Sequence, residues 1–292
     1  MANVLITGCS SGLGREGALA FARRGDRVYA TVRNTRQCVE LEQLAAGQQL
    51  DIHPRLLDVT RSDTFASFVS ELIATAGHID VLVNNAGILR PGAWEDLSEE
   101  SIREVMETNF FGAMLLTRTL LPHLRDQGSG YIINISSLSG IAGLAGDVAY
   151  SASKFALEGA TEALRHEVDR WGIHVALVEA AQYATNIFKD SASPASDYPA
   201  DSPYWSLIEH KREHTNANLH NALPASDIGK LLLQIANSDG SQLRWPADEL
   251  SRHVLHTLHG QSDAERDTFL RMAGDSDWWS HGEQMPAIND NN

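Results

Sequence analysis

The chain has 292 residues, of which 43% are hydrophobic and 21% charged, a composition typical of a globular protein and unlike that of a wholly disordered one. Its formal net charge of -15 argues against a nucleic acid or an anionic membrane as partner, because phosphate groups repel an acidic surface. The two cysteines, Cys9 and Cys38, are too few for a disulfide framework, so a reducing compartment is expected. We expect no signal peptide before Val4 and no membrane span, which together predict a cytoplasmic location.

Short β-type runs alternate with helical patterns along the chain. Several of the runs are apolar on both faces, as in a parallel sheet covered by helices. The alternation predicts one α/β domain, residues 1–292, with a doubly wound, Rossmann-like parallel sheet of about seven strands and helices on both faces. The predicted strands are 4–7, 27–32, 55–58, 81–84, 131–136, 174–179 and, more weakly, 243–245. The predicted helices are 15–24, 36–46, 63–76, 99–127, 150–171 and 225–237.

A glycine-rich stretch follows the first predicted strand. It reads Thr7-Gly8-Cys9-Ser10-Ser11-Gly12-Leu13-Gly14 and leads into a helical pattern. Glycines let the backbone approach a pyrophosphate closely, and a helix N-terminus supplies free N–H groups. A structural turn is the alternative, but the position between the first strand and the first helix favours a dinucleotide site.

The end of the second predicted strand bears on the choice of cofactor. An acidic residue there would bond the ribose 2′-hydroxyl of NAD, whereas an arginine accommodates the 2′-phosphate of NADP. The sequence has no acid at this point and places Arg33 there, with Arg36 nearby. It predicts NADP rather than NAD, unless Arg33 is only a solvated surface charge.

Polar residues follow the third and fourth predicted strands. Asp58, next to Val59, could accept a hydrogen bond from an adenine amino group. The amides in 84–87, Asn-Asn-Ala-Gly, could join neighbouring strands and leave backbone groups facing a ligand. Both could instead be turn chemistry. Asn109 interrupts an apolar helix face, which indicates a kink or a bound water, with a structural role as the alternative.

Tyr150 and Lys154 stand four residues apart at the start of the predicted helix 150–171. This spacing places both side chains on one helix face. The pKa of a free phenol is about 10, and a neighbouring ammonium group would lower the pKa. The pair is therefore a candidate for acid–base chemistry.

Five motifs together give the chain a resemblance to the short-chain dehydrogenase/reductase family over about residues 3–185. They are Thr7-Gly8-x-x-x-Gly12-x-Gly14, the Asn-Asn-Ala-Gly motif, Asn109, Ser137 and Tyr150-x-x-x-Lys154. The chain looks like members that act on secondary alcohols and ketones of apolar, steroid- or retinoid-like compounds. The stretches 29–33 and 154–157 add to this likeness.

The resemblance implies a role for each catalytic residue. Tyr150 would give or take the proton, and Ser137 would hydrogen-bond the substrate oxygen. Lys154 would lower the pKa of Tyr150 and bind the nicotinamide ribose, and Asn109 would hold a water in a proton relay. The implied cofactor contacts are Thr7, Gly8, Ser10, Ser11, Gly12, Leu13, Gly14, Arg33, Asp58, Val59, Asn85, Ala86, Gly87, Tyr150, Lys154, Tyr183 and Thr185. The expected substrate contacts are Ser137, Leu138, Leu144, Tyr150 and Tyr183.

The sequence departs from the family pattern after the sixth predicted strand. A Pro-Gly pair is usual there, but this chain has Ala180-Ala181, while Thr185 keeps its place. If the family's glycine takes a positive φ or lets the nicotinamide approach, Ala181 must either shift the backbone or carry strain on the order of 1 kcal/mol. We then expect weakened nicotinamide binding or a displaced substrate loop.

The last hundred residues differ in composition from the rest. Residues 183–225 are interpreted as a substrate lid, with a variable surface insertion as the alternative. Residues 274–292 are interpreted as a polar, loose tail whose Trp278 and Trp279 could dock on the body or on a neighbouring subunit. The histidines at 210 and 214 and at 253, 256 and 259 lack the glutamate placement of a zinc helix and are interpreted as solvated. No metal site is predicted.

The sequence thus predicts an NADP(H)-dependent oxidoreductase for an apolar alcohol or ketone. The alternative is an NADP(H)-binding regulator that senses redox state with little or no turnover. In the resembling family the helices that correspond to 99–127 and 150–171 form subunit interfaces, so a homodimer or homotetramer is expected.

Overall fold

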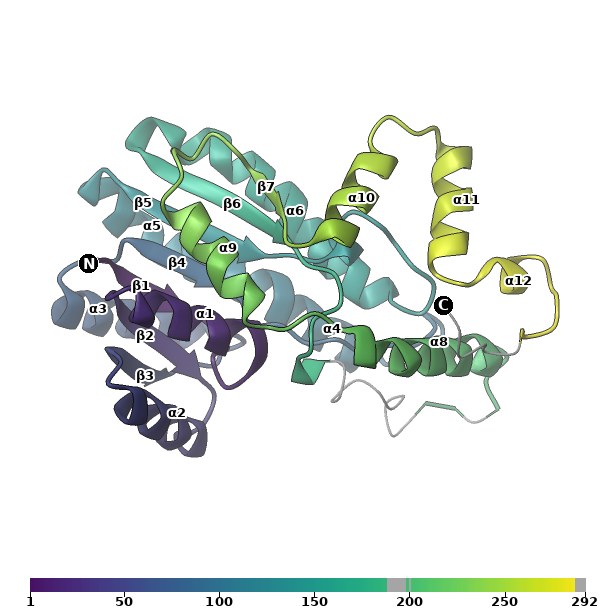
Figure 1. Cartoon of the computed structure of the whole chain (residues 1–292), viewed down its shortest axis with the longest axis horizontal. Helices are drawn as coiled ribbons and strands as arrows, with labels where there is room; N and C mark the ends of the chain where they lie inside the picture. The colour runs from purple at the N-terminus through teal and green to yellow at the C-terminus, as the bar shows by residue number, and fades with distance from the viewer. Residues whose placement is uncertain (188–197, 200, 287–292) are drawn as a thin grey trace.

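The computed structural model describes residues 1–187, 198–199 and 201–286. Within this part of the chain, seven parallel strands form one sheet in the order β3-β2-β1-β4-β5-β6-β7 (Figure 1). The predicted fold class is therefore confirmed. The strands are β1 Asn3–Ile6, β2 Arg27–Val32, β3 Ile52–Leu56, β4 Val81–Asn84, β5 Gly130–Ile135, β6 Ile173–Glu179 and β7 Arg244–Pro246.

Helices cover both faces of the sheet (Figure 1). Side chains alternate along each strand, so Val4 and Ile6 face one apolar core while Leu5 faces the other. The helices are α1 Gly12–Arg23, α2 Thr35–Gln48, α3 Phe65–Ala76, α4 Glu99–Met106, α5 Gly112–Gln127, α6 Val148–Val168, α8 Trp205–Asn218, α9 Asp227–Ala236, α10 Glu249–Leu258, α11 Asp263–Ala273 and α12 Asp277–Ser280. No helix of the described ranges has the length and apolar character needed to cross a membrane.

The strand order reverses beside β1, which pairs with β2 on one side and β4 on the other. In such a sheet a crevice opens at the carboxyl ends of the strands where the order reverses. The loops after β1 and β4 therefore meet there. Helices α8 and α10 lie beyond the same edge (Figure 1).

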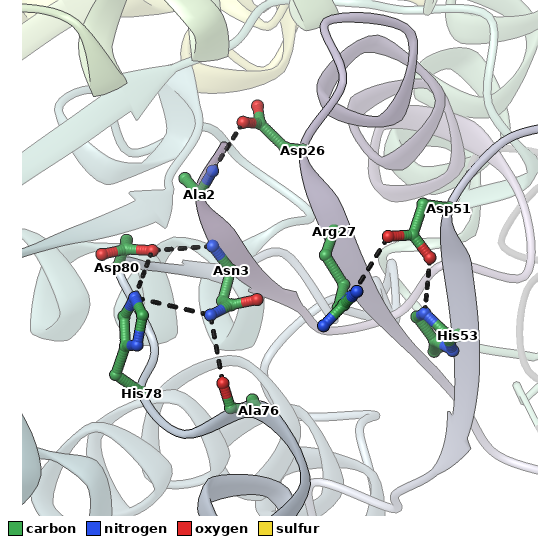
Figure 2. A network of polar contacts seen from close by, with 9 residues as sticks. All are labelled: Ala2, Asn3, Asp26, Arg27, Asp51, His53, Ala76, His78 and Asp80. Carbon is green, nitrogen blue, oxygen red and sulfur yellow. Dashed lines mark hydrogen bonds and ion pairs between the residues drawn. The ribbon is translucent and has the colours of Figure 1, made fainter.

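Figure 2 shows a polar network at the opposite edge, where the strands begin. Asp26 accepts a hydrogen bond of 2.8 Å from the backbone N–H of Ala2, and Asp80 accepts one of 2.7 Å from Asn3. Arg27 donates to Asp51 at 3.1 Å. These contacts fix the starts of neighbouring strands and lie away from the crevice.

Two predicted elements have different bounds in the structure. The predicted strand 55–58 is β3, Ile52–Leu56, which contains Pro54. An edge strand tolerates a proline because one of its sides needs no partner, and β3 is at the edge. The predicted helix 99–127 is interrupted by a π-helical turn, Glu107–Phe111, between α4 and α5.

Candidate active site

The glycine-rich turn after β1 is closed against the loop after β4. Gly8 and Gly12 have φ angles of +72° and +58°, which favour glycine. The Asn85 amide donates to the carbonyl oxygens of Thr7 and Gly8 at 2.8 and 3.1 Å. A Cβ at Gly14 would lie 2.3 Å from the Nδ2 of Asn85, so only glycine fits there. The turn, which we call the cradle, thus packs closely against the loop after β4 at the start of α1.

Hydrogen bonds join β4 to its neighbours, as the sequence predicts. The Thr7 hydroxyl accepts from the backbone N–H groups of Asn85 and Ala86, both at 3.0 Å. Asn84 donates to Asn134 on β5 at 2.8 Å and to Thr117 on α5 at 2.9 Å. These bonds hold the 84–87 loop beside the glycine turn.

Arg33 follows β2 directly and is exposed. Arg36, by contrast, is paired with Glu40 at 2.8 Å on the outside of α2. Asp58 accepts hydrogen bonds from the backbone and hydroxyl of Thr60, at 2.9 and 2.8 Å, and Val59 is buried. Asp58 therefore has the turn role considered as its alternative, and its adenine contact stays a prediction.

Ser137, Tyr150 and Lys154 are brought together between β5 and the first turns of α6. The Ser137 hydroxyl accepts from the N–H of Ser139 at 3.2 Å and hydrogen-bonds with Tyr150. The Lys154 Nζ donates to the carbonyl of Ile135 at 2.8 Å and lies 5.8 Å from the centre of the Tyr150 ring. The three groups thus converge, and Tyr150 and Lys154 lie on one helix face as predicted from their spacing.

Burial dominates the electrostatics of this trio. Burial raises the pKa of Tyr150 to about 12, and the hydrogen bond from Ser137 only partly opposes it. Burial lowers the pKa of Lys154 to about 8, against the negative charge of Glu158. The prediction of a lowered Tyr150 pKa is therefore wrong for the protein's own groups, because desolvation of the phenol outweighs the other effects.

Asn109 lies in the π-helical turn, so the predicted kink is confirmed. Its carboxamide accepts from the N–H of Ile88 at 2.8 Å and donates to the Ile88 carbonyl at 2.9 Å. It also donates to Ser153 at 3.0 Å, and Ser153 donates to the carbonyl of Tyr150 at 2.7 Å. Asn109 thereby links the loop after β4 to the start of α6. Its water contact stays a prediction.

The Ala180-Ala181 step is unstrained. Among the described non-glycine residues, only Gln49 and Asp275 have positive φ angles. The N–H of Ala181 donates to Asp248 at 3.1 Å. The expected backbone strain at Ala181 is therefore wrong, because the chain accommodates alanine there in an ordinary conformation.

Two predicted contact residues follow this step. Thr185 lies over the glycine turn, since a Cβ at Gly12 would come 3.1 Å from its Cβ. Tyr183 is buried, and its hydroxyl donates to the carbonyl of Ala247 at 3.0 Å. Burial also raises the pKa of this phenol. Tyr183 thus anchors the segment to the loop after β7, and its ligand contacts stay predictions.

The loop after β5, which holds the expected substrate contacts Ser137, Leu138 and Leu144, is covered by the C-terminal helices. Leu138 and Ile141 pack with Val254 and Leu258 of α10 and with Phe269 of α11. A Cβ at Gly274 would lie 3.3 Å from the Cδ2 of Leu144. The loop that holds Ser137 is therefore walled by a segment that sequence reasoning did not connect to the site.

Helix α8, in the predicted lid, contacts both the segment before Tyr150 and the C-terminal helices. Lys211 donates to Asp147, three residues before Tyr150, at 2.6 Å. His210 is 2% exposed and bonds Asp275 at 2.8 Å, so its interpretation as a solvated residue is wrong. Trp278 of α12 is buried against the His210 ring at 5.4 Å, which confirms its predicted docking on the body. Residues 188–197 and 200 of the predicted lid and 287–292 of the tail lie outside the described residues.

Sequence reasoning missed three charged residues below the site. Glu158 and Glu179 are buried, and Arg244 of β7 contacts both. A signal existed for each glutamate. Glu158 stands one helical turn after Lys154, and Glu179 ends an otherwise apolar strand.

Comparison with known proteins gives consistent matches. Residues 2–195 match the family model "short chain dehydrogenase". A 3-ketodihydrosphingosine reductase from Bacteroides thetaiotaomicron is 38% identical over 73% of this chain and 77% of its own length. Human retinol dehydrogenase 8 is 39% identical over 62% of this chain and 59% of its own length. The crystal structure of a short-chain dehydrogenase from Streptomyces avermitilis has a TM-score of 0.75 at 29% identity, covering 96% of this chain and 97% of its own.

Proposed function

Because the chain belongs to the short-chain dehydrogenase/reductase family, we propose that it is an NADP(H)-dependent oxidoreductase that interconverts a secondary alcohol and a ketone on a mainly apolar small molecule. The observation that carries the proposal is the convergence of Ser137, Tyr150 and Lys154 at the carboxyl edge of the sheet. The glycine turn opens at the same edge.

The residues of the glycine turn fit a dinucleotide. Side chains at Gly8 and Gly14 would collide with the 84–87 loop or the turn itself, so the two loops can approach this closely only with glycine at both positions. Ser11 precedes α1 without capping it through its side chain, which leaves the first N–H groups of the helix for a pyrophosphate. Thr185 and Lys154 would hold the nicotinamide end, which supplies or accepts the hydride when bound.

The residues of this chain handle the proton. With a pKa of about 12, Tyr150 stays protonated near neutral pH and is suited to donate to the oxygen of a ketone as negative charge develops there. Ser137 provides the second hydrogen bond that fixes the oxygen. In the oxidative direction Tyr150 would have to be ionised before it could accept the proton of the alcohol, and the positive charge of Lys154 would favour that ionised form. Asn109 holds the start of α6 in place through Ser153.

An apolar substrate is supported by the loop after β5 and by the relatives. Leu138 and Leu144 stand on the segment that follows Ser137, beneath apolar side chains of α10 and α11. The names of two relatives specify a long-chain keto compound and a retinoid alcohol, both largely apolar. We therefore assign the substrate to this chemical class.

The preference for NADP rests on Arg33, which is exposed at the end of β2 and followed by a capping asparagine rather than an acid. Replacing Arg33 by alanine should weaken NADP binding about tenfold, the worth of one phosphate contact, and leave NAD binding nearly unchanged. Titration of cofactor fluorescence measures both dissociation constants. Arg36→Ala is the matched control, because Arg36 points outward and pairs with Glu40. Tighter binding of NAD than NADP by the unmodified protein would overturn the preference.

Turnover separates this proposal from a redox-sensing regulator. Absorbance of the reduced nicotinamide should change with time across a panel of apolar ketones and secondary alcohols. Cofactor binding without any such change over the whole panel would favour the regulator. The altered Ala180-Ala181 step is the sequence feature that favours the regulator, and its backbone has an ordinary conformation.

A homodimer or homotetramer in the cytoplasm completes the proposal. The proposal rests on the family resemblance at α5 and α6, where Phe111, before α5, and Phe155 of α6 are 40% and 43% exposed. Light scattering of the purified protein would give the assembly.

A further inference from the structure

Two glutamates lie buried below the proposed catalytic trio. Glu158 stands on α6, one turn after Lys154, and is 3% exposed. Glu179 ends β6 and is fully buried. The loop after β5 closes over Glu158, since a Cβ at Gly140 would come 3.2 Å from its Oε1. Carboxylates are seldom buried to this degree unless they are paired or protonated.

The cations around the two carboxyl groups are too few to pair both. Arg244 Nη2 lies 3.0 Å from Glu158, whereas Arg244 Nε lies 3.7 Å from Glu179, too far for a hydrogen bond. The same guanidinium is 3.1 Å from Glu162, which is half exposed. Lys154 contributes its charge to Glu158 from the preceding helical turn. One arginine and one lysine thus face three carboxyl groups, two of them away from water.

Like charges in one buried site do not both ionise readily. Burial and the charge of Glu158 raise the pKa of Glu179 to about 8. Burial raises the pKa of Glu158 as well, but Ser136, Arg244 and Lys154 oppose that rise, so Glu158 is the better placed of the two to ionise. Its negative charge in turn opposes the loss of the Lys154 proton.

We propose that Glu158 and Glu179 carry one proton between them at neutral pH, with Glu179 protonated and Glu158 ionised, and that this arrangement keeps Lys154 cationic. Both glutamates are then positioning residues for the Tyr150–Lys154 pair. Lys154 titrates close to neutral pH, so a modest change in its surroundings decides its charge. The inference deepens the proposed function, on which the catalytic meaning of the Lys154 charge rests.

The first test needs no substitution. With ¹³C at the glutamate carboxyl carbons, one carboxyl of the full-length protein should titrate above pH 7, far from the ordinary range of about 4.3. The signal should vanish in Glu179→Gln, which identifies it. If every glutamate carboxyl titrates below pH 6, the proposal is overturned.

The second test follows Lys154 directly. The chain has four lysines, Lys154, Lys189, Lys211 and Lys230, so ¹³Cε-lysine spectra are simple, and Lys154→Arg assigns the signal. Glu158→Gln should lower the midpoint of the Lys154 titration by roughly one pH unit, because a nearby negative charge is lost. Glu162→Gln is the matched control, since Glu162 contacts the same arginine from the exposed side. Equal midpoints in Glu158→Gln and Glu162→Gln would overturn the proposal.

A pH profile of turnover connects the pair to the reaction. In Glu158→Gln the limb of the kcat profile that reports loss of the Lys154 proton should move to lower pH together with the titration. A structural role alone would lower activity equally at every pH. Both titrations can be made without substrate, so they succeed or fail separately from the oxidoreductase activity.

Discussion

The Tyr150 phenol is the residue on which the proposed chemistry depends. Tyr150→Phe keeps the ring but removes the group that exchanges a proton with the substrate oxygen. We expect kcat to fall by roughly 10²- to 10⁴-fold, while the dissociation constant of NADP stays within about threefold. Stopped or continuous assays of nicotinamide absorbance and a binding titration measure the two effects.

Tyr131→Phe is the control for this change. Tyr131 donates its hydroxyl to the backbone carbonyl of Ser238 and lies at the start of β5, away from the trio. Its loss should leave kcat nearly unchanged. Activity retained in Tyr150→Phe would remove Tyr150 from the mechanism.

Glu179 should make the stability of the protein depend on pH. Its pKa is raised from 4.5 to about 8 in the folded chain. Between these values the folded state binds more protons than the unfolded state, so the free energy of unfolding falls as pH rises from about 4.5 to 8 and levels off above. Glu179→Gln removes this contribution and should therefore be the more stable protein at pH 8, on the order of a few kcal/mol, and about equal to the parent at pH 5.

Urea unfolding at pH 5 and pH 8 measures the difference. Glu162→Gln, which removes a half-exposed carboxyl from the same arginine, should show little change at either pH. A pH-independent difference between Glu179→Gln and the parent would contradict the raised pKa.

The turn between β1 and α1 is the element that forms the cofactor cradle. A Cβ at Gly14 would meet Asn85 Nδ2 at 2.3 Å and the Gly8 carbonyl at 2.5 Å. Gly14→Ala should thus force the turn away from the 84–87 loop, lower the free energy of unfolding by about 1–3 kcal/mol and weaken NADP binding at least tenfold. Thermal melts and a cofactor titration test both.

Gly47→Ala is the matched control on a neighbouring element. Gly47 lies in α2 with open space where a Cβ would stand. Alanine there should stabilise the helix by up to about 1 kcal/mol and leave cofactor binding unchanged. If Gly14→Ala behaved in the same way, the close approach of the two loops would not matter for binding.

Element types followed from hydrophobic periodicity, whereas their interruptions depended on tertiary contacts. The pattern 99–127 is helical throughout, but the structure has a π turn within it. In that turn the Asn109 amide donates hydrogen bonds to Ile88 and Ser153. In the same way, Pro54 kept the first residues of β3 out of the predicted strand 55–58. They form a strand because β2 pairs with one of its sides. A local sequence pattern does not show which distant residues will be hydrogen-bond partners.

At the scale of the molecule, α8 and α12 connect the C-terminal segment to the substrate side. Trp278 is buried against His210, and Lys211 on the same helix reaches Asp147 beside Tyr150. Trp278→Ala should loosen this contact, lower the free energy of unfolding by about 3 kcal/mol and raise KM for an apolar ketone several-fold. NADP binding should not change, because the cradle lies on β1 and β4.

Trp171→Ala provides the comparison. Trp171 is 37% exposed, in the turn before β6, and its loss should cost less than about 1 kcal/mol and leave KM unaltered. Equal KM values for Trp278→Ala and the parent would separate the C-terminal helices from substrate binding.

The sequence by itself determined the fold class, the glycine turn and the shared helix face of Tyr150 and Lys154, because period, spacing and turn chemistry are local properties that the chain carries in order. Ser137 came from the family resemblance. Only the tertiary structure decided how these groups behave. It placed Glu179 and Arg244, distant in sequence, below Lys154, brought α10 and α11 over the loop after β5, and showed Ala181 to be unstrained. Burial is a property of the assembled molecule, and burial raised the pKa of Tyr150 where its lysine neighbour alone predicted the opposite.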